Sequence, residues 1–491
     1  MKSINKWILS LSVITVFGTG EVVAQSGYFE EALRFSQLRS TGSARVSGLG
    51  GTQNSLGGDI SNIHSNPAGL GFFRRSEFSL SPGYSSWGTE TTFGNARTSD
   101  AVTNFALPNL SLVISNPRDP LSPGRFRGGS FGVSVNRMAN FNSRFATSGI
   151  TDNSLTDFFA QDAFGVPGNV LDVENSLRGL AYSTFLINPS EEFPNEYVPF
   201  NEFENPLMNE EVVTEGGINQ VTFAYGGNLD NKLFLGASLG ISSINYSQFK
   251  LFQEDFSDHG YDVNEDLFIN GTGVNLNIGA IYKPVDHINL GLSFQTPTWY
   301  RLNEEYGAEI ISEFDSPNQE FSSSARTDLI LSTYNLTTPM KINAGITYFV
   351  GKNGFISADI DYVDYTANRL NSQDFNPRPD NDAINQLYTA TFNYRVGGEF
   401  RYDIFRARGG FGYYGDPFRN DFDDPSRHTT QISGGLGVRL AKFYVDLAVM
   451  NTSFDQFYRS YTLIQGGQNV GPISDVRNNI TSGILTVGLN F

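Results

Sequence analysis

The sequence contains no cysteine among its 491 residues. This absence excludes disulfide bonds, thiolate metal sites and a lipid anchor on cysteine, and it leaves the redox compartment undetermined. The chain has only four histidines, His64, His259, His287 and His428, and their spacing marks neither a catalytic pair nor a haem ligand pair. Acidic stretches such as 416–424 lack the ligand spacing of a known calcium loop, so solvated charge is the favoured interpretation. We therefore expect no enzyme activity, no cofactor and no metal site.

Long apolar runs are also missing. After the N-terminus no segment has the ~18 consecutive apolar residues that a membrane-spanning helix needs. Hydrophobic residues make up 39% of the chain, whereas Gly (51), Phe (41) and Tyr (22) are abundant. This composition suits many short, twisted strands with one wet face, and a β-barrel needs only alternation to cross a membrane. The net charge of −18 makes nucleic acid an unsuitable partner.

The N-terminus has the three parts of a secretory signal peptide. Lys2 and Lys6 precede an apolar core at 7–17, and Val22-Val23-Ala24 supplies small residues for cleavage after Ala24. The apolar core is too short to cross a bilayer of ~30 Å. We therefore assign residues 1–24 to a signal peptide, and the mature chain starts at Gln25.

Apolar residues alternate with polar ones along many later segments. Leu485, Val487, Leu489 and Phe491 show this period of two at the very end of the chain. Several charges lie in mid-strand, opposite the apolar positions: Asp359, Asp361, Arg395, Glu399, Arg401, Arg406 and Arg408. In a barrel these charges would face the lumen and pair across strands. Alternation alone leaves a soluble sandwich open, in which the same charges would be solvated outside.

The lengths of the connections distinguish these two folds. We expect strands at 77–88, 105–115, 129–141, 217–228, 232–250, 271–284, 287–302, 339–350, 354–366, 387–402, 404–415, 428–440, 442–458 and 479–491. Short connections alternate with long ones along the sequence. The connection 116–128 is the exception, because its place in this alternation calls for a short turn and it has thirteen residues. Outer-membrane barrels have short periplasmic turns, long external loops and an even strand number. The sequence therefore predicts an all-β fold, a transmembrane antiparallel β-barrel of fourteen strands over residues 77–491, with a long external insertion at about 142–216.

Residues 25–76 precede the first strand and are rich in glycine turns, among them Asn66-Pro67-Ala68-Gly69. The segment carries apolar residues to bury, and the lumen of a polar barrel is the natural place for it. We therefore expect an N-terminal plug, or hatch. A phosphate cradle is disfavoured because no Gly-Lys-Ser/Thr follows the glycines.

Several stretches together resemble the FadL-type outer-membrane transporters of long-chain fatty acids and aromatic hydrocarbons. They are 61–70 with its Asn-Pro-Ala motif, 278–284, 338–345 and 394–400, and they extend over most of the mature chain. The resemblance implies a fourteen-stranded barrel blocked by a hatch that contains Asn66, Pro67 and Ala68. It also implies capture of hydrophobic ligands by external loops and sideways release at a kinked third strand, here near Gly128, Gly129 and Gly132.

The insertion at 142–216 departs from the pattern of that family. The ligand-capture site of the family therefore cannot be assigned residue by residue to this sequence. The insertion contains Phe158, Phe159, Phe164 and Phe185 among other apolar residues, with acidic residues clustered from Glu191 to Glu215. One interpretation is an apolar capture groove at the cell surface. The alternative is a loop that buries its own phenylalanines to stay folded.

The function expected from these observations is passive uptake of hydrophobic small molecules, fatty-acid-like or aromatic, across the outer membrane of a Gram-negative bacterium. The expected partners are that ligand, outer-membrane lipid and, during biogenesis, the barrel-assembly machinery, since the terminal Phe491 resembles its recognition signal. A protein-interaction or secretion component is the alternative, and an outer-membrane hydrolase is the weakest one. The sequence does not identify the ligand, because apolar pockets discriminate weakly between homologous chains.

Overall fold

The computed structural model of the chain describes residues 27–38, 42–119, 121, 123–200, 204–257, 259–316, 319–419 and 426–491. The predicted signal peptide, 1–24, lies outside the described residues. In the part that is described, no helix is long and apolar enough to cross a membrane.

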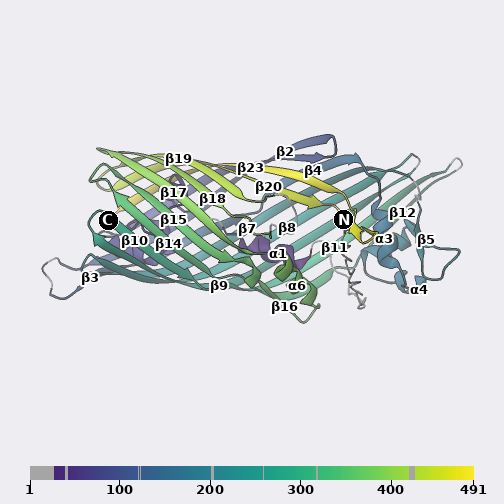
Figure 1. Cartoon of the computed structure of the whole chain (residues 1–491), viewed down its shortest axis with the longest axis horizontal. Coiled ribbons are helices and arrows are strands. Elements are labelled where there is room, and N and C mark those ends of the chain that lie inside the picture. The colour runs from purple at the N-terminus through teal and green to yellow at the C-terminus, as the bar shows by residue number, and fades with distance from the viewer. Residues whose placement is uncertain are drawn as a thin grey trace, which may run out of the picture.

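Within this described part, fourteen antiparallel strands form a closed barrel (Figure 1). They are β1 (Glu77–Phe93), β2 (Ala96–Pro117), β3 (Phe126–Asn140), β7 (Leu207–Leu229), β8 (Leu233–Asp255), β9 (His259–Val285), β10 (Ile288–Gln295), β14 (Lys341–Phe349), β15 (Gly354–Asp364), β17 (Ala390–Tyr402), β18 (Phe405–Tyr414), β19 (Thr429–Arg439), β20 (Phe443–Arg459) and β23 (Ile473–Asn490). Successive strands pair, and β1 closes the barrel against β23 from Glu77↔Asn490 onward. The predicted fold class and strand number are confirmed, and each predicted strand overlaps one of these fourteen.

The external ends of the strands extend further than the sequence predicts. The segment 89–104, expected to be a long loop, is a hairpin, because β1 and β2 pair as far as Phe93↔Ala96. In the same way β8 and β9 stay paired as far as Asp255↔Gly260, so most of the predicted loop 251–270 is strand. Along β9 the buried residues Val263, Leu267 and Ile269 share one face, but Glu265 interrupts their apolar alternation.

Further elements cover the end of the barrel predicted to be external, and they occupy the middle and right of Figure 1. The strands among them are β4 (Ser143–Ile150), β5 (Ile187–Pro189), β6 (Tyr197–Pro199), β11 (Trp299–Ser316), β12 (Gln319–Arg326), β13 (Ile330–Thr337), β16 (Arg369–Ser372), β21 (Ile464–Gln465) and β22 (Gln468–Asn469). The helices are α3 (Leu155–Ala163), α4 (Gly168–Leu171), α5 (Leu177–Ser183), η3 (Tyr365–Ala367) and α6 (Arg378–Leu387). The opposite end has short turns and holds the C-terminus (Figure 1).

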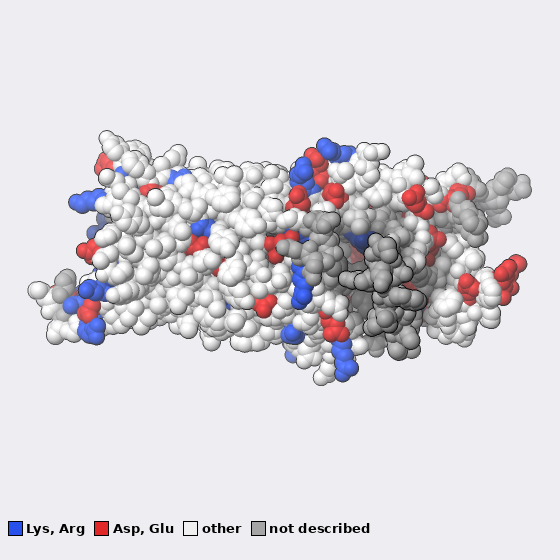
Figure 2. Space-filling model, viewed as in Figure 1, with Lys and Arg blue, Asp and Glu red and all other residues white. Residues whose placement is uncertain are grey.

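The outer face of the half with short turns is apolar. Figure 2 shows a broad, mostly uncharged band there, with charged residues of both signs at its edges. On β20, Leu447 is 50% exposed on the outside, whereas its neighbour Asp446 is fully buried in the lumen. This alternation is the pattern of a barrel with lipid outside and polar groups inside.

The N-terminal segment enters the barrel before β1 begins. It forms α1 (Tyr28–Ser36), α2 (Ala44–Ser47) and two 3₁₀ helices, η1 (Ile60–Ile63) and η2 (Pro67–Phe72). Most residues from 42 to 73 are buried, and η2 contacts β3, β7, β8 and β9. Figure 1 shows this segment, in purple, enclosed by the barrel wall.

Candidate functional site: the lumen and an interruption in the barrel wall

The lumen segment, defined here as residues 42–76, is fastened to the wall near its Asn-Pro-Ala motif. Asn66 is fully buried, and its amide nitrogen donates to the carbonyl of Asn54 at 2.7 Å and to that of Ala280 on β9 at 3.3 Å. Its side-chain oxygen accepts from the backbone N–H of Ala68 and so caps η2, in which Pro67 takes the first position. One side chain thus joins the turn, the 3₁₀ helix and the barrel.

Glycines on the wall make room for this motif. A Cβ at Gly279 would lie 1.9 Å from Oδ1 of Asn66, and a Cβ at Gly236 would lie 2.3 Å from the carbonyl carbon of Pro67. Four strands further around the barrel, a Cβ at Gly397 would lie 2.2 Å from the carbonyl oxygen of Leu49. The lumen segment therefore fits against backbone that only glycine leaves uncovered.

Charges of the lumen also hold the segment. Asp359 accepts from the backbone N–H groups of Gln53 at 2.8 Å and Asn54 at 3.0 Å. Arg45 of α2 forms ion pairs with Glu399 of the wall at 3.3 Å and with Asp59 at 3.4 Å. Sequence reasoning missed Arg45, although it is an isolated cation within the glycine-rich stretch.

The structure places the seven mid-strand charges of the sequence prediction as follows. Asp359, Asp361, Arg395, Glu399 and Arg408 are all less than 9% exposed in the lumen, whereas Arg401 and Arg406 lie partly exposed beside the β17–β18 turn. Arg395 pairs with Asp361 at 2.6 Å, and Arg408 bridges Glu399 and Asp446 at 2.7 Å each. These groups thus form a paired network that includes the lumen segment.

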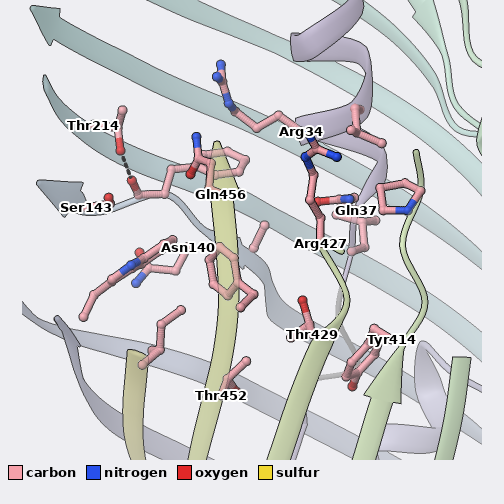
Figure 3. A pocket seen from close by; sticks show the side chains of 18 of the residues that line it. Arg34, Gln37, Asn140, Ser143, Thr214, Tyr414, Arg427, Thr429, Thr452 and Gln456 are labelled. Carbon is pink, nitrogen blue, oxygen red and sulfur yellow. Dashed lines mark hydrogen bonds between the residues drawn. The ribbon is translucent and has the colours of Figure 1, made fainter. Parts of the chain in front are cut away.

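A cavity of about 640 Å³ lies on the external side of the lumen segment. Its lining includes Phe29, Leu33 and Arg34 of α1, with the aromatic side chains of Tyr246 from β8 and of Tyr388 at the end of α6. Figure 3 shows Arg34 of α1 and Gln37, which follows this helix, in the lining together with Thr452 and Gln456 of β20. The guanidinium carbon of Arg34 lies 4.6 Å from the ring centroid of Tyr246, and its Nη1 is buried without a hydrogen-bond partner in the described part of the chain.

Helix α1 is fixed in place by buried tyrosine–carboxylate bonds. Tyr334 donates to Glu31 at 2.5 Å, and Tyr28 donates to Glu304 at 2.9 Å. The hydroxyl of Tyr388 also donates to the carbonyl of Phe29 at 3.0 Å. The cavity therefore has one rigid helical wall and one barrel wall, with both apolar and polar groups facing it.

The ladder between β2 and β3 is interrupted beside this cavity. The two strands pair only from Asn109↔Asn136 to Pro117↔Gly128, and beyond Asn109 the strand β2 pairs with β1 alone. Pro108 has no N–H to extend the ladder, and β3 carries an irregularity between Arg137 and Ala139. Pro108, Met138 and Ala139 all line the cavity, which thus reaches the wall from both sides of the interruption.

The ladder is unbroken at the three glycines that the sequence predicts for a lateral opening. Gly128, Gly129 and Gly132 pair on one side with β2 and on the other with β7, so the wall is continuous at all three. Gly132 instead leaves space for Ile63 of the lumen segment, whose side chain would lie 2.8 Å from an added Cβ. Pro108, which falls within a predicted strand, was the feature of the sequence that could have marked the interruption.

The four phenylalanines predicted to form a capture groove lie apart from the cavity. None of Phe158, Phe159, Phe164 and Phe185 lines it. Phe159 is fully buried in the core of the insertion, as in a loop that buries its own aromatic residues, whereas Phe164 is 68% exposed. Phe185 has a positive φ of 63° and makes an edge contact with Phe321 at 5.8 Å.

The insertion is anchored to β8 by a buried carboxyl group outside the membrane-spanning part of the barrel. Glu254 accepts from Ser154, from Tyr261 and from the backbone N–H of Leu155, at 3.2 Å for the last. Burial raises the pKa of Glu254 to about 8, although these hydrogen bonds lower it. Among the described residues no group of three or more His, Asp or Glu side chains could hold a metal ion.

Comparison with known proteins relates the chain to two groups. The family model described as BamG matches residues 190–407. No curated protein matches the sequence at a significant level. Two similar solved structures are a FadL homologue of Pseudomonas aeruginosa (TM-score 0.57, 14% identity, covering 92% of this chain and 99% of that one) and the toluene transporter TodX of Pseudomonas putida (TM-score 0.51, 13% identity, 91% and 98%). The predicted resemblance is confirmed at the level of the fold: the chain is an outer-membrane type β-barrel with the architecture of FadL-type transporters.

Proposed function

We propose that the chain is an outer-membrane channel of a Gram-negative bacterium for the passive entry of hydrophobic small molecules. The observation that carries this proposal is the cavity that extends from α1 to the interruption between β2 and β3. A ligand from outside would occupy this cavity and leave sideways past Pro108 into the bilayer. Residues 42–76 would act as the hatch and close the direct path to the periplasm, which their burial against β3, β7, β8 and β9 supports.

The lining favours ligands with a polar end over pure hydrocarbons. Leu33, Phe141 and Tyr246 offer apolar contact, whereas the buried Nη1 of Arg34 has no hydrogen-bond acceptor among the described residues. A fatty-acid-like molecule satisfies both, because a carboxylate accepts charge-assisted hydrogen bonds from a guanidinium. Arg34→Met should therefore weaken uptake of a fatty acid more than uptake of an aromatic hydrocarbon.

A cross-link across the interruption tests the path. The chain has no cysteine, so Ala106→Cys with Ala139→Cys can be bridged by a flexible bis-maleimide without side reactions. The control pair is Ile114→Cys with Phe131→Cys, which face each other in the intact ladder on the lipid side. Cross-linking should abolish uptake of a labelled fatty acid into proteoliposomes for the first pair only. Equal uptake in both cross-linked proteins would contradict sideways release.

The BamG match favours a second candidate, a protein-interaction role with the barrel-assembly machinery. Depleting the chain from cells separates the two. Loss of uptake with normal levels of other outer-membrane barrels supports the channel, whereas a general fall in those barrels supports the assembly role.

A further inference from the structure

A groove of about 400 Å³ lies on the outer wall, near the end of the barrel with short turns. Strands β17, β18, β19 and β20 form it, and its lining is almost entirely apolar. The side chains at its rims are large and exposed: Phe400 is 60%, Phe405 55% and Leu436 66% exposed. The side chain of Ala407 between them is small. The groove is therefore a depression in the lipid-facing surface and is separate from the lumen cavity.

The groove lies at the depth of the periplasmic leaflet. Its lining residues are within about five positions of the β17–β18 and β19–β20 turns, which corresponds to ~15 Å along a strand. The apolar band of an outer-membrane barrel is ~25 Å tall. Lipids of the periplasmic leaflet can thus reach the groove with their acyl chains while their headgroups stay level with the turns.

Cations stand at the periplasmic edge of the groove. Nη1 of Arg406 donates to the carbonyls of Asp403 and Phe405 at 2.7 Å each, which holds its guanidinium at the tip of the β17–β18 hairpin. Lys442 is exposed in the β19–β20 turn, and Arg75 is bonded to the carbonyl of Ala441 beside it at 3.1 Å. Asp403 lies at the same edge and Glu399 acts on Arg406 from the lumen, so the three cations Arg406, Lys442 and Arg75 stand beside two acids.

We propose that this groove binds one anionic phospholipid of the periplasmic leaflet. An acyl chain would lie over Ala407 between the aromatic rims, and the phosphate would contact Arg406 and Lys442. The volume of the groove is in the range of small-molecule binding sites. Each cation near an anionic lipid headgroup strengthens the binding of that lipid by about fivefold. Both halves of an amphipathic lipid thus have a matching surface on the protein.

Quenching by brominated lipid tests the site. Phe405→Trp provides a reporter in the groove, in a background with Trp87→Phe and Trp299→Phe, since the only other tryptophan lies in the predicted signal peptide. Tyr348→Trp is the matched control, a residue 51% exposed at the periplasmic end of β14, away from the groove. The protein is reconstituted in phosphatidylcholine bilayers with a small fraction of brominated phosphatidylglycerol.

We expect the groove reporter to be quenched at severalfold lower brominated phosphatidylglycerol than the control reporter, with no such difference for brominated phosphatidylcholine. Arg406→Gln with Lys442→Gln should remove this preference. Ala407→Phe fills the groove and keeps the cations, and it should lower quenching at the groove by either lipid. Equal quenching at both reporters, or a preference that survives the removal of the cations, would overturn the proposal; a preference unaffected by Ala407→Phe would reduce it to attraction by a basic rim.

Discussion

The fit between the wall and the lumen segment makes the effect of one added methyl group calculable. In Gly279→Ala the new Cβ would lie 1.9 Å from Oδ1 of Asn66, whereas ordinary contact begins at 3.4 Å. Asn66 must therefore move by about 1.5 Å, which breaks its bonds to the carbonyls of Asn54 and Ala280. Alanine itself suits the backbone here, because φ of Gly279 is not positive.

The expected loss follows from two contributions. Overpacking of a tight contact costs about 1–3 kcal/mol, and each lost hydrogen bond costs about 1 kcal/mol. We expect Gly279→Ala to reduce the free energy of unfolding by about 3–5 kcal/mol, the sum of the overpacking and the two lost hydrogen bonds. Since the strain acts on the lumen segment, we also expect raised conductance of small ions through a planar bilayer that contains the variant.

Gly409→Ala is the control, because a Cβ at Gly409 on the outer face of β18 would have no atom within 4 Å. It should leave both the unfolding midpoint and the conductance unchanged. If Gly279→Ala behaved like Gly409→Ala in both assays, the segment would not be wedged against the wall, and its role as the hatch would lose its support.

Three further predictions concern the wall and its ends. Leu447→Arg places a cation in hydrocarbon and should destabilise the barrel by about 2–4 kcal/mol in refolding titrations, whereas Thr452→Arg on the same strand faces the cavity and should be tolerated. Glu254→Ala should destabilise the insertion by ~1–3 kcal/mol, because buried donors lose their acceptor, and proteolysis on intact cells measures the effect. The raised pKa of about 8 means that the folded state favours the protonated carboxyl of Glu254. The stabilisation by Glu254 should therefore be complete below about pH 4.5 and decline as the pH rises through 8. Deleting Phe491 removes two backbone bonds to Ser76, at 2.9 and 3.1 Å, at the seam where the barrel closes, and should lower the amount of folded protein in the outer membrane.

Each of these has a contrary outcome. Similar destabilisation by the two arginine variants of β20 would show that the inside and outside of the strand are wrongly assigned. Glu254→Gln keeps an acceptor and should protect the insertion at neutral pH, so equal proteolysis of the Gln and Ala variants would contradict the hydrogen-bond argument. Normal insertion without Phe491 would show that closure does not depend on the last residue.

The sequence by itself determined the fold class and the number of strands. These properties follow from local rules: side chains alternate sides with a period of two, and turns are fixed by a few neighbouring residues. The same rules place Asp446 and Leu447 on opposite faces without any knowledge of their partners. The lumen position of the glycine-rich segment was also expected from its composition.

The tertiary structure alone decided what meets across long separations in the chain. The interruption of the wall depends on Pro108 and on the register between β3 and β7, which no local pattern contains. Arg45 meets Glu399 although 354 positions separate them, and the groove on the outer wall arises from four strands side by side. Periodicity indicates which face a residue takes, but only the register of the closed barrel determines which residues share that face at the same height.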